Sequence, residues 1–345
     1  MTDRNVQMQD EHIGKRLANL FATNRLVSLA VVNIIIIAAV GIAFPDTFFT
    51  ASNFSVILLS ISMEAILAVG MIFLIVAGEF DLSIGAVYAL GGAIAATLMK
   101  QAEWLPFPFA VLLALITCTV IGLMNGLLVA KVGVNALITT LGMMMVVRAI
   151  AVYLAGSAIV DLPEGFVRLG QTVFLGLRMP VYYMLFIVII GAYLLSSFPF
   201  FRQFYFIGGN RKSAVLSGIK VAKSLVINFA IMGFLAGLGG IISAARLNNA
   251  VGSTGAGLHL RIIAAVVLGG GSLSGGKGSV GGAVMGVLLL GLLQNTMIIA
   301  GVSVYFQTIV TGVILIIAVL LDVMVQKRFE IKQQSIHVKG MSVKK

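Results

Sequence analysis

Ten long apolar segments restrict this chain to one class of protein. They cover residues 26–44, 54–77, 82–99, 106–130, 134–156, 181–199, 222–245, 258–270, 279–299 and 303–322. A helix needs about 20 apolar residues to cross the hydrocarbon of a bilayer, and every segment except the short eighth comes near that length. Charged residues make up only 10% of the chain, whereas a water-soluble domain carries about 25%. The sequence therefore predicts an all-α polytopic membrane protein with about ten transmembrane helices.

The composition argues against several kinds of chemistry. The single cysteine, Cys118, excludes an internal disulfide and a thiolate zinc cluster, and three widely separated histidines argue against a His-rich metal site. The protease patterns HExxH and GxSxG do not occur in the sequence. We expect no catalytic residue, no metal and no directly bound cofactor.

The positive charge is concentrated on one side of the predicted helices. With the N-terminus inside, 17 of the 23 Lys and Arg residues fall in cytoplasmic segments, five fall on the other side, and Arg148 lies within a span. The positive-inside rule then places an N-tail (1–25) and a C-tail (323–345) in the cytoplasm, around a transmembrane domain at 26–322. The net charge of +11 thus reflects orientation and contact with anionic membrane lipid, not nucleic acid. Acidic residues before the first apolar run indicate a retained helix, not a secretory signal.

Ten helices divide into two sets of five, and an odd number per set allows an inverted repeat, a common transporter plan. The glycine-bounded break at 78–85 would then have its counterpart at 246–261 on the opposite face. Three pairs of glycines have the small-xxx-small spacing of closely packed membrane helices: Gly122/Gly126, Gly233/Gly237 and Gly282/Gly286.

Two acids interrupt the apolar sequence at the first break, Gly78-Glu79-Phe80-Asp81-Leu82-Ser83-Ile84-Gly85. One interpretation is a cytoplasmic turn in which Asp81 caps the third helix by accepting N–H groups of its first turn. The other places Glu79 and Asp81 at the inner mouth of a pathway. Glu64 lies inside the second span, and an intramembrane acid is by default a pathway residue or a packing hydrogen-bond site.

The longest cytoplasmic loop, 200–221, contains a short helix signal. Asn210 is a good N-cap, Gly218 is a stop signal, and the residues between them can form a turn or two of helix. Ala214, Val215 and Leu216 would be available to pack on a soluble partner, or to rest on lipid.

A glycine-rich segment at 269–279 contains Gly271-x4-Gly276-Lys277, the opening of a phosphate-binding loop. Gly278 stands where that motif needs Ser or Thr, and apolar helices replace the strand that should precede it. We interpret this segment as a tight connection between the eighth and ninth spans.

An ordered series of motifs from about residue 50 to 322 resembles the permease subunit of the ribose-type ABC sugar importers. The motifs are Asn53, Gly70-Met71, the segment 78–85, Gly122-Leu123-Met124-Asn125-Gly126-Leu127-Leu128-Val129, Leu137-Ile138-Thr139-Thr140-Leu141-Gly142, Ile207-Gly208-Gly209-Asn210, Leu216-Ser217-Gly218-Ile219, Ile263-Ala264-Ala265-Val266-Val267-Leu268-Gly269-Gly270 and Ser272-Leu273-Ser274-Gly275-Gly276-Lys277-Gly278-Ser279. The chain departs from the usual family pattern at Glu79-Phe80, at Arg211-Lys212 and at His259-Leu260-Arg261.

The resemblance implies a permease in the bacterial inner membrane that pairs with a second permease subunit. Cytoplasmic ABC ATPases would use the ATP, and a periplasmic solute-binding protein would deliver a monosaccharide. The segment that resembles the ATPase-coupling helix comprises Asn210, Arg211, Lys212, Ser213, Ala214, Val215, Leu216, Ser217, Gly218 and Ile219. Candidates for the translocation path or gate are Glu64, Gly78, Glu79, Asp81, Ser83, Asn125 and Thr139.

Alternatives remain open at this point. Related permeases carry autoinducer-2, nucleosides or branched-chain amino acids. A stand-alone secondary transporter would need coupling acids deep in several spans, and Glu64 alone lies clearly inside one. A structural membrane scaffold would not need spans broken by glycine.

Overall fold

The computed structural model describes residues 25–102, 104–317 and 319–320, and this part of the chain is predominantly helical. Helix is found in all ten apolar segments: α2 (Arg25–Ala43), α4 (Ala51–Val76), α5 (Ile84–Gln101), α6 (Phe107–Leu127), α7 (Ala136–Ala155), α9 (Met179–Ser197), α12 (Val221–Leu247), α13 (Leu258–Leu268), α14 (Val280–Ile299) and Val304–Ile317. In the described ranges, seven helices are long and apolar enough to cross a membrane. The C-tail 323–345, and the N-tail except Arg25, lie outside the described residues.

Short elements connect the long helices. They are α3 (Pro45–Phe48), the π-helical turn η1 (Leu128–Val132) that extends α6, α8 (Glu164–Gln171), α10 (Pro199–Gly209) and α11 (Arg211–Leu216). Strand β1 (Ile159–Val160) pairs antiparallel with β4 (Asn249–Ala250), and β2 (Val173–Phe174) pairs with β3 (Leu177–Arg178). The described part of the chain is therefore all-α apart from two small ribbons, and the stretch 157–180 between the fifth and sixth apolar segments holds a helix and three strands.

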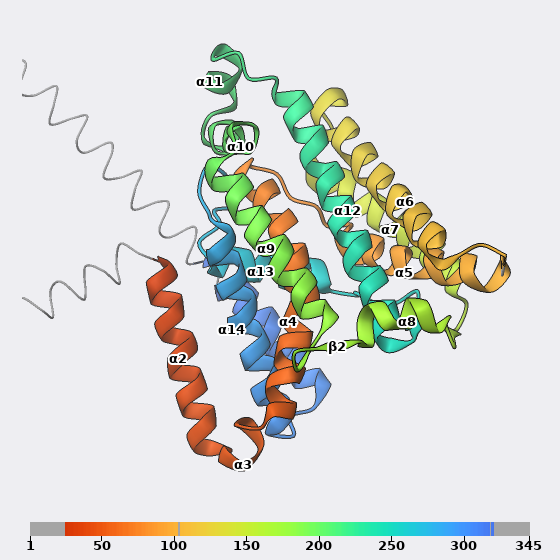
Figure 1. The fold of residues 1–345 in the computed structure, drawn as a ribbon. Helices are drawn as coiled ribbons and strands as arrows, with labels where there is room; N and C mark the ends of the chain where they lie inside the picture. The colour runs from red at the N-terminus through yellow and green to blue at the C-terminus, as the bar shows by residue number, and fades with distance from the viewer. Residues whose placement is uncertain (1–24, 103, 318, 321–345) are drawn as a thin grey trace, which may run out of the picture.

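The two longest helices, α4 and α12, form the core and pack against each other. Helix α4 also packs on α9, α13 and α14, whereas α12 also packs on α5, α6 and α8. Figure 1 shows α2 at the edge of the bundle, with α10 and α11 at one end and α3 and α8 at the other. Helix α4 of the first half thus packs on α13 and α14 of the second half, and α12 of the second half packs on α5 and α6 of the first. These contacts join the two halves of the chain.

Asparagines at the helix contacts add hydrogen bonds between these helices. The Asn228 side chain of α12 donates to the carbonyl of Phe73 in α4 at 2.8 Å. Asn53 and Asn295 exchange two amide hydrogen bonds, at 3.3 and 2.7 Å, between α4 and α14. In an apolar environment such bonds stabilise helix association, because the alternative is an unpaired polar group.

The glycine pairs predicted from the sequence lie where helices touch backbone to backbone. Gly122 of α6 packs against the Phe229 carbonyl and Gly233 of α12, and Gly286 of α14 packs against the Ala265 carbonyl of α13. A methyl group at Gly122, Gly233 or Gly286 would overlap the facing backbone, so only glycine permits these distances. The prediction of close packing through these motifs is confirmed.

The two broken spans meet inside the molecule. Gly85, at the start of α5, lies against the Gly255 carbonyl, and a Cβ added there would be 3.6 Å from Leu258 Cβ at the start of α13. Arg148 of α7 fastens this junction, since its guanidinium donates to the carbonyls of Gly85 and Thr254 at 3.0 and 2.7 Å. The breaks at 78–85 and 246–261, expected on opposite faces, therefore converge at their inner ends.

Candidate translocation and coupling site

The segment 269–279 and helix α10 meet beside the end of α4. The Gly276 N–H donates to the carbonyl of Val76, the last residue of α4, at 2.8 Å. The Tyr205 hydroxyl of α10 donates to the Gly278 carbonyl at 2.8 Å, and Gly208 packs against Gly276. The glycine-rich segment 269–279 is thus a compact turn between α13 and α14, as expected, and it covers the end of α4.

Asp81 is at the centre of a buried polar cluster between α4 and α5. The residue is only 1% exposed. Its Oδ1 accepts from the Ser83 N–H at 2.7 Å and from the Ser83 hydroxyl at 2.6 Å. Asn125 of α6 donates to Asp81 Oδ2 at 3.3 Å and to Ser83 Oγ at 3.0 Å. Burial raises the pKa of Asp81, and the hydrogen bonds from Ser83 and Asn125 oppose that rise.

This geometry changes the expected capping role. Asp81 was expected to accept N–H groups from the first turn of α5, but it accepts from Ser83, the residue that precedes the helix. Asp81 therefore shapes the turn that leads into α5. Gly78, at the start of this turn, has a φ of 80°, which glycine adopts without strain.

The predicted path residues Asp81, Ser83 and Asn125 are brought together, whereas Thr139 is not part of their cluster. The neighbouring Thr140 accepts from the Leu82 N–H at 3.1 Å. Thr139 is buried, and its hydroxyl has no hydrogen-bond partner among the described residues. The rotation of α7 about its axis decides which of the two threonines faces the turn. The spacing of residues in the sequence does not reveal that rotation.

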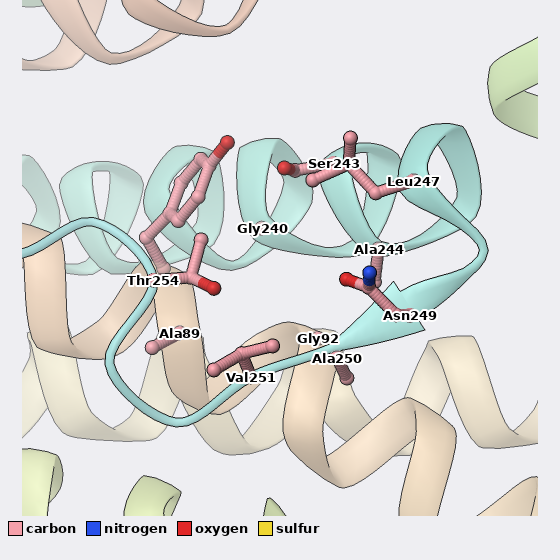
Figure 2. Close-up of a pocket in the computed structure, with 11 residues that line it drawn as sticks. Ala89, Gly92, Gly240, Ser243, Ala244, Leu247, Asn249, Ala250, Val251 and Thr254 are labelled. Atoms are coloured by element: carbon pink, nitrogen blue, oxygen red, sulfur yellow. The ribbon is translucent and has the colours of Figure 1, made fainter. Parts of the chain in front are cut away.

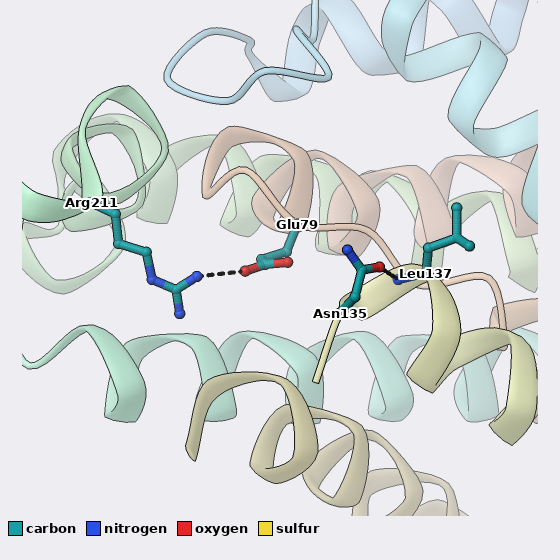
Figure 3. Close-up of polar contacts among 4 residues, drawn as sticks. All are labelled: Glu79, Asn135, Leu137 and Arg211. Atoms are coloured by element: carbon teal, nitrogen blue, oxygen red, sulfur yellow. Dashed lines mark hydrogen bonds and ion pairs between the residues drawn. The ribbon is translucent and has the colours of Figure 1, made fainter. Parts of the chain in front are cut away.

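Glu79 connects the break to α11. Its Oε1 lies 3.1 Å from Nη1 of Arg211, the first residue of α11, as Figure 3 shows. The Glu79 side chain is 12% exposed and that of Arg211 is 50% exposed. Burial raises the pKa of Glu79, and the Arg211 guanidinium partly counteracts this. The acid predicted at the inner mouth and the predicted coupling segment are therefore in direct contact.

Helix α11 has the ends that the sequence predicts. Asn210 Oδ1 accepts from the Ser213 N–H at 3.0 Å, and Gly218 ends the turn with a φ of 82°. Its accessible surface differs from the expectation, because Ala214 is only 3% exposed and packs within the chain. Val215 and Leu216 are the exposed apolar residues, and Leu216 is 88% exposed.

Glu64 of α4 pairs with Arg261 of α13, a residue that charge counting placed in an external loop. Glu64 Oε2 and Arg261 Nε are 3.1 Å apart, and both side chains are largely buried. The pair joins the two halves of the chain. A search for a charge of opposite sign in the other half would have been the sequence signal for it.

The contact between α5 and α12 leaves almost no open space. Figure 2 shows the segment from Asn249 to Thr254 crossing between these helices, beside Ser243. The cavity there measures about 10 Å³, which is at the lower limit for a single water molecule. This contact contributes packing and does not accommodate a solute.

The fold defines a polytopic membrane protein in which broken helices meet at a polar centre, an arrangement typical of transporters. The sequence matches the family described as "Branched-chain amino acid transport system / permease component" over residues 53–319. The chain belongs to this family of transport permeases.

Curated relatives cover most of the chain. It is 41% identical to the ribose import permease protein RbsC of Escherichia coli K12 over 298 residues, which are 84% of this chain and 91% of that protein. It is 40% identical to RbsC of Haemophilus influenzae, over 84% of this chain and 90% of that protein. It is 36% identical to the L-arabinose transport system permease protein AraH of Escherichia coli K12, over 82% and 86% of the two chains. No solved structure matches the sequence.

Proposed function

We propose that this chain is the membrane-spanning subunit of an ABC importer and forms the translocation path for a monosaccharide. The observation that carries the proposal is the similarity to ribose and arabinose permeases over more than four fifths of their length. In this importer a second permease subunit completes the path, a cytoplasmic ATPase supplies the energy, and a periplasmic binding protein delivers the sugar.

The geometry supports a route for the energy. Val215 and Leu216 are the surface that docks on the ATPase, and movement of α11 reaches the 78–85 turn through Arg211 and Glu79. A small helix held against a groove transmits force because packed interfaces switch between discrete arrangements. Asp81, Ser83 and Asn125 keep the turn in shape, and Gly78 and Thr139 flank it as gate candidates.

The proposed topology has ten spans and both termini in the cytoplasm. Two observations support an inverted repeat of five helices. The longest helices, α4 and α12, are second in their sets, and each is followed by a glycine-rich break whose next helix begins at the shared centre. In Figure 1, α11 lies at the end of the bundle opposite to α8, as cytoplasmic and periplasmic segments should.

Reconstituted transport tests this function. The permease, its ATPase and its binding protein are placed in liposomes, and uptake of labelled D-ribose and L-arabinose is measured with ATP or ADP. We expect uptake of a monosaccharide only with ATP and all partners. Uptake driven by an ion gradient without the ATPase would indicate a secondary transporter. Competition by leucine, a nucleoside or autoinducer-2, but by no sugar, would assign a different substrate.

A further inference from the structure

A cavity of about 370 Å³ lies beside the Glu64–Arg261 pair. Small-molecule sites typically measure about 300–1,000 Å³, so this volume suits a compact solute. Residues from α4, the segment before α13, α13, α14 and the last helix line it, among them Glu64, Arg261, Gln294, Gln307, Thr308 and Thr311. The cavity therefore joins both halves of the chain.

The last described helix, Val304–Ile317, has a polar stripe, a row of polar side chains that lines the cavity. Gln307, Thr308 and Thr311 follow one another at the spacing of a single helix face, within a helix whose outer residues Tyr305 and Ile309 are exposed and apolar in character. Polar side chains inside a membrane are costly unless they face water, protein partners or a solute. This stripe faces an ion pair across open space.

The hydroxyl hydrogens of this stripe are already used. Thr308 donates to the Val304 carbonyl at 3.0 Å, and Thr311 donates to the Gln307 carbonyl at 2.8 Å. Their oxygens still hold lone pairs, and these can accept hydrogen bonds from a bound molecule. The stripe thus offers acceptors.

The opposite wall offers donors. Arg261 Nη2 is buried and has no hydrogen-bond partner among the described residues, although its Nε lies 3.1 Å from Glu64. The Gln294 side chain, whose amide can donate hydrogen bonds, lines the same cavity. A buried donor without a partner is unfavourable, and a ligand oxygen in the cavity would satisfy it.

We propose that this cavity is a binding site on the translocation path for a neutral solute with several hydroxyl groups, an inference that rests on the proposed function. A hydroxyl both donates and accepts, so a polyol can bond the Arg261 and Gln294 donors and the Glu64 and threonine acceptors together. The paired charges of Glu64 and Arg261 cancel, and this disfavours a cation and an anion alike.

Cysteine protection tests the site in the assembled importer. Because Cys118 is the single cysteine of the chain, Cys118→Ala gives a cysteine-free parent with one change. Thr308→Cys in this background is labelled with a hydrophilic maleimide in the complex of permease, ATPase and binding protein, with and without D-ribose. Glu164→Cys, on the exposed surface of α8, is the matched control. We expect ribose to slow labelling at position 308 and to leave labelling at position 164 unchanged.

Uptake kinetics provide a second readout that leaves the ion pair intact. Gln294→Leu removes an amide that lines the cavity, and we expect KM for D-ribose to rise roughly two- to tenfold, the effect of one lost hydrogen bond. Thr296→Val is its control on the same helix, because that hydroxyl bonds the Leu292 carbonyl and does not line the cavity. Membrane abundance is measured for both.

The outcomes separate the two proposals. If the parent importer takes up ribose but position 308 is labelled equally with and without it, or Gln294→Leu keeps the parental KM, the cavity is not a solute site and the proposed function stands. If the parent complex takes up neither ribose nor arabinose, the monosaccharide function fails, and this site assignment fails with it.

Discussion

Arg211 at the start of α11 forms an ion pair with Glu79 in the turn between α4 and α5, across 132 positions of sequence. The pair joins the helix proposed to contact the ATPase to the turn proposed to shape the inner mouth. It is half exposed on the Arg211 side, so its function in transmission of movement should exceed its contribution to stability.

A double-mutant cycle with Glu79→Gln and Arg211→Ala measures that contribution. We expect a coupling free energy of unfolding of about 0.5–1 kcal/mol, because solvent screens an exposed guanidinium. ATP-driven uptake should fall in either single variant at normal membrane abundance. Additive effects on both stability and uptake would mean that the contact does not connect the two segments.

Asp81→Ala should lose uptake and stability, by about 1–3 kcal/mol, because Ser83 and Asn125 would be left with unpaired buried groups. Asp81→Asn should insert normally and keep most uptake. Its Oδ1 can still accept from Ser83, and its amide can donate to Asn125 Oδ1, which has no partner among the described residues, once the Asn125 amide rotates to exchange its oxygen and nitrogen. Loss of uptake by a stable Asp81→Asn variant would show that the carboxylate charge itself is required.

The contribution of Asp81 to the free energy of unfolding depends on pH with a definite sign. Because burial raises the pKa of Asp81 above its ordinary 3.8, the folded parent binds a proton more readily than the unfolded chain. Its free energy of unfolding should therefore rise as the pH falls through the raised pKa, and the gain should be complete near 3.8. Asp81→Asn lacks this gain. Thermal unfolding in detergent, followed as the pH is lowered from neutral to about 3.8, should show the stability of the parent rising relative to that of Asp81→Asn; parallel curves would refute the expectation.

Leu216→Asp should reduce co-purification of the ATPase and abolish uptake while the permease remains abundant in the membrane. The residue is 88% exposed, so its replacement leaves internal packing unchanged. Ala214→Trp should instead lower the abundance of the permease itself, since Ala214 is buried within the chain. Normal ATPase binding by Leu216→Asp would remove α11 as the docking helix.

Gly240→Ala should destabilise the protein strongly, because an added methyl would overlap the Tyr88 carbonyl where α12 crosses α5. Gly142→Ala is the matched control in α7, where an added Cβ meets no atom within 4 Å. There the change should be neutral or stabilising by up to about 1 kcal/mol, the helix preference of alanine. Detergent unfolding of the two variants would compare them, and similar losses at both positions would contradict the packing account.

Reporter fusions test the orientation. A phosphatase that is active only in the periplasm should be active after Gly176, in the turn between β2 and β3, and silent after Lys345. The expectation follows from the 17 cations assigned to one side and the five assigned to the other. Activity at Lys345 would overturn the ten-span arrangement.

Local features could be read from the sequence because their causes are local. The cap of α11 by Asn210, its end at Gly218 and the compact 269–279 turn depend on residues within one or two turns of each other. Which face of α11 is exposed depends on α10 and α12, which pack against it, and so Ala214 was misassigned. The Glu64–Arg261 pair was missed because each charge was considered by itself, without a search of the other half of the chain for a charge of opposite sign.

The hydrogen bond from Gly276 to the last carbonyl of α4 has a consequence for protein engineering and for evolution. A turn from the second half of the chain thus completes the end of a helix from the first half. Gly275 of that turn packs against Gly208 and Gly78 so closely that there is no room for a methyl group on it. The packing therefore depends on glycine in segments that are far apart in the sequence. A chimera between this chain and a ribose or arabinose permease should assemble only when it keeps glycine at the positions of both Gly208 and Gly275, wherever else the exchange is made.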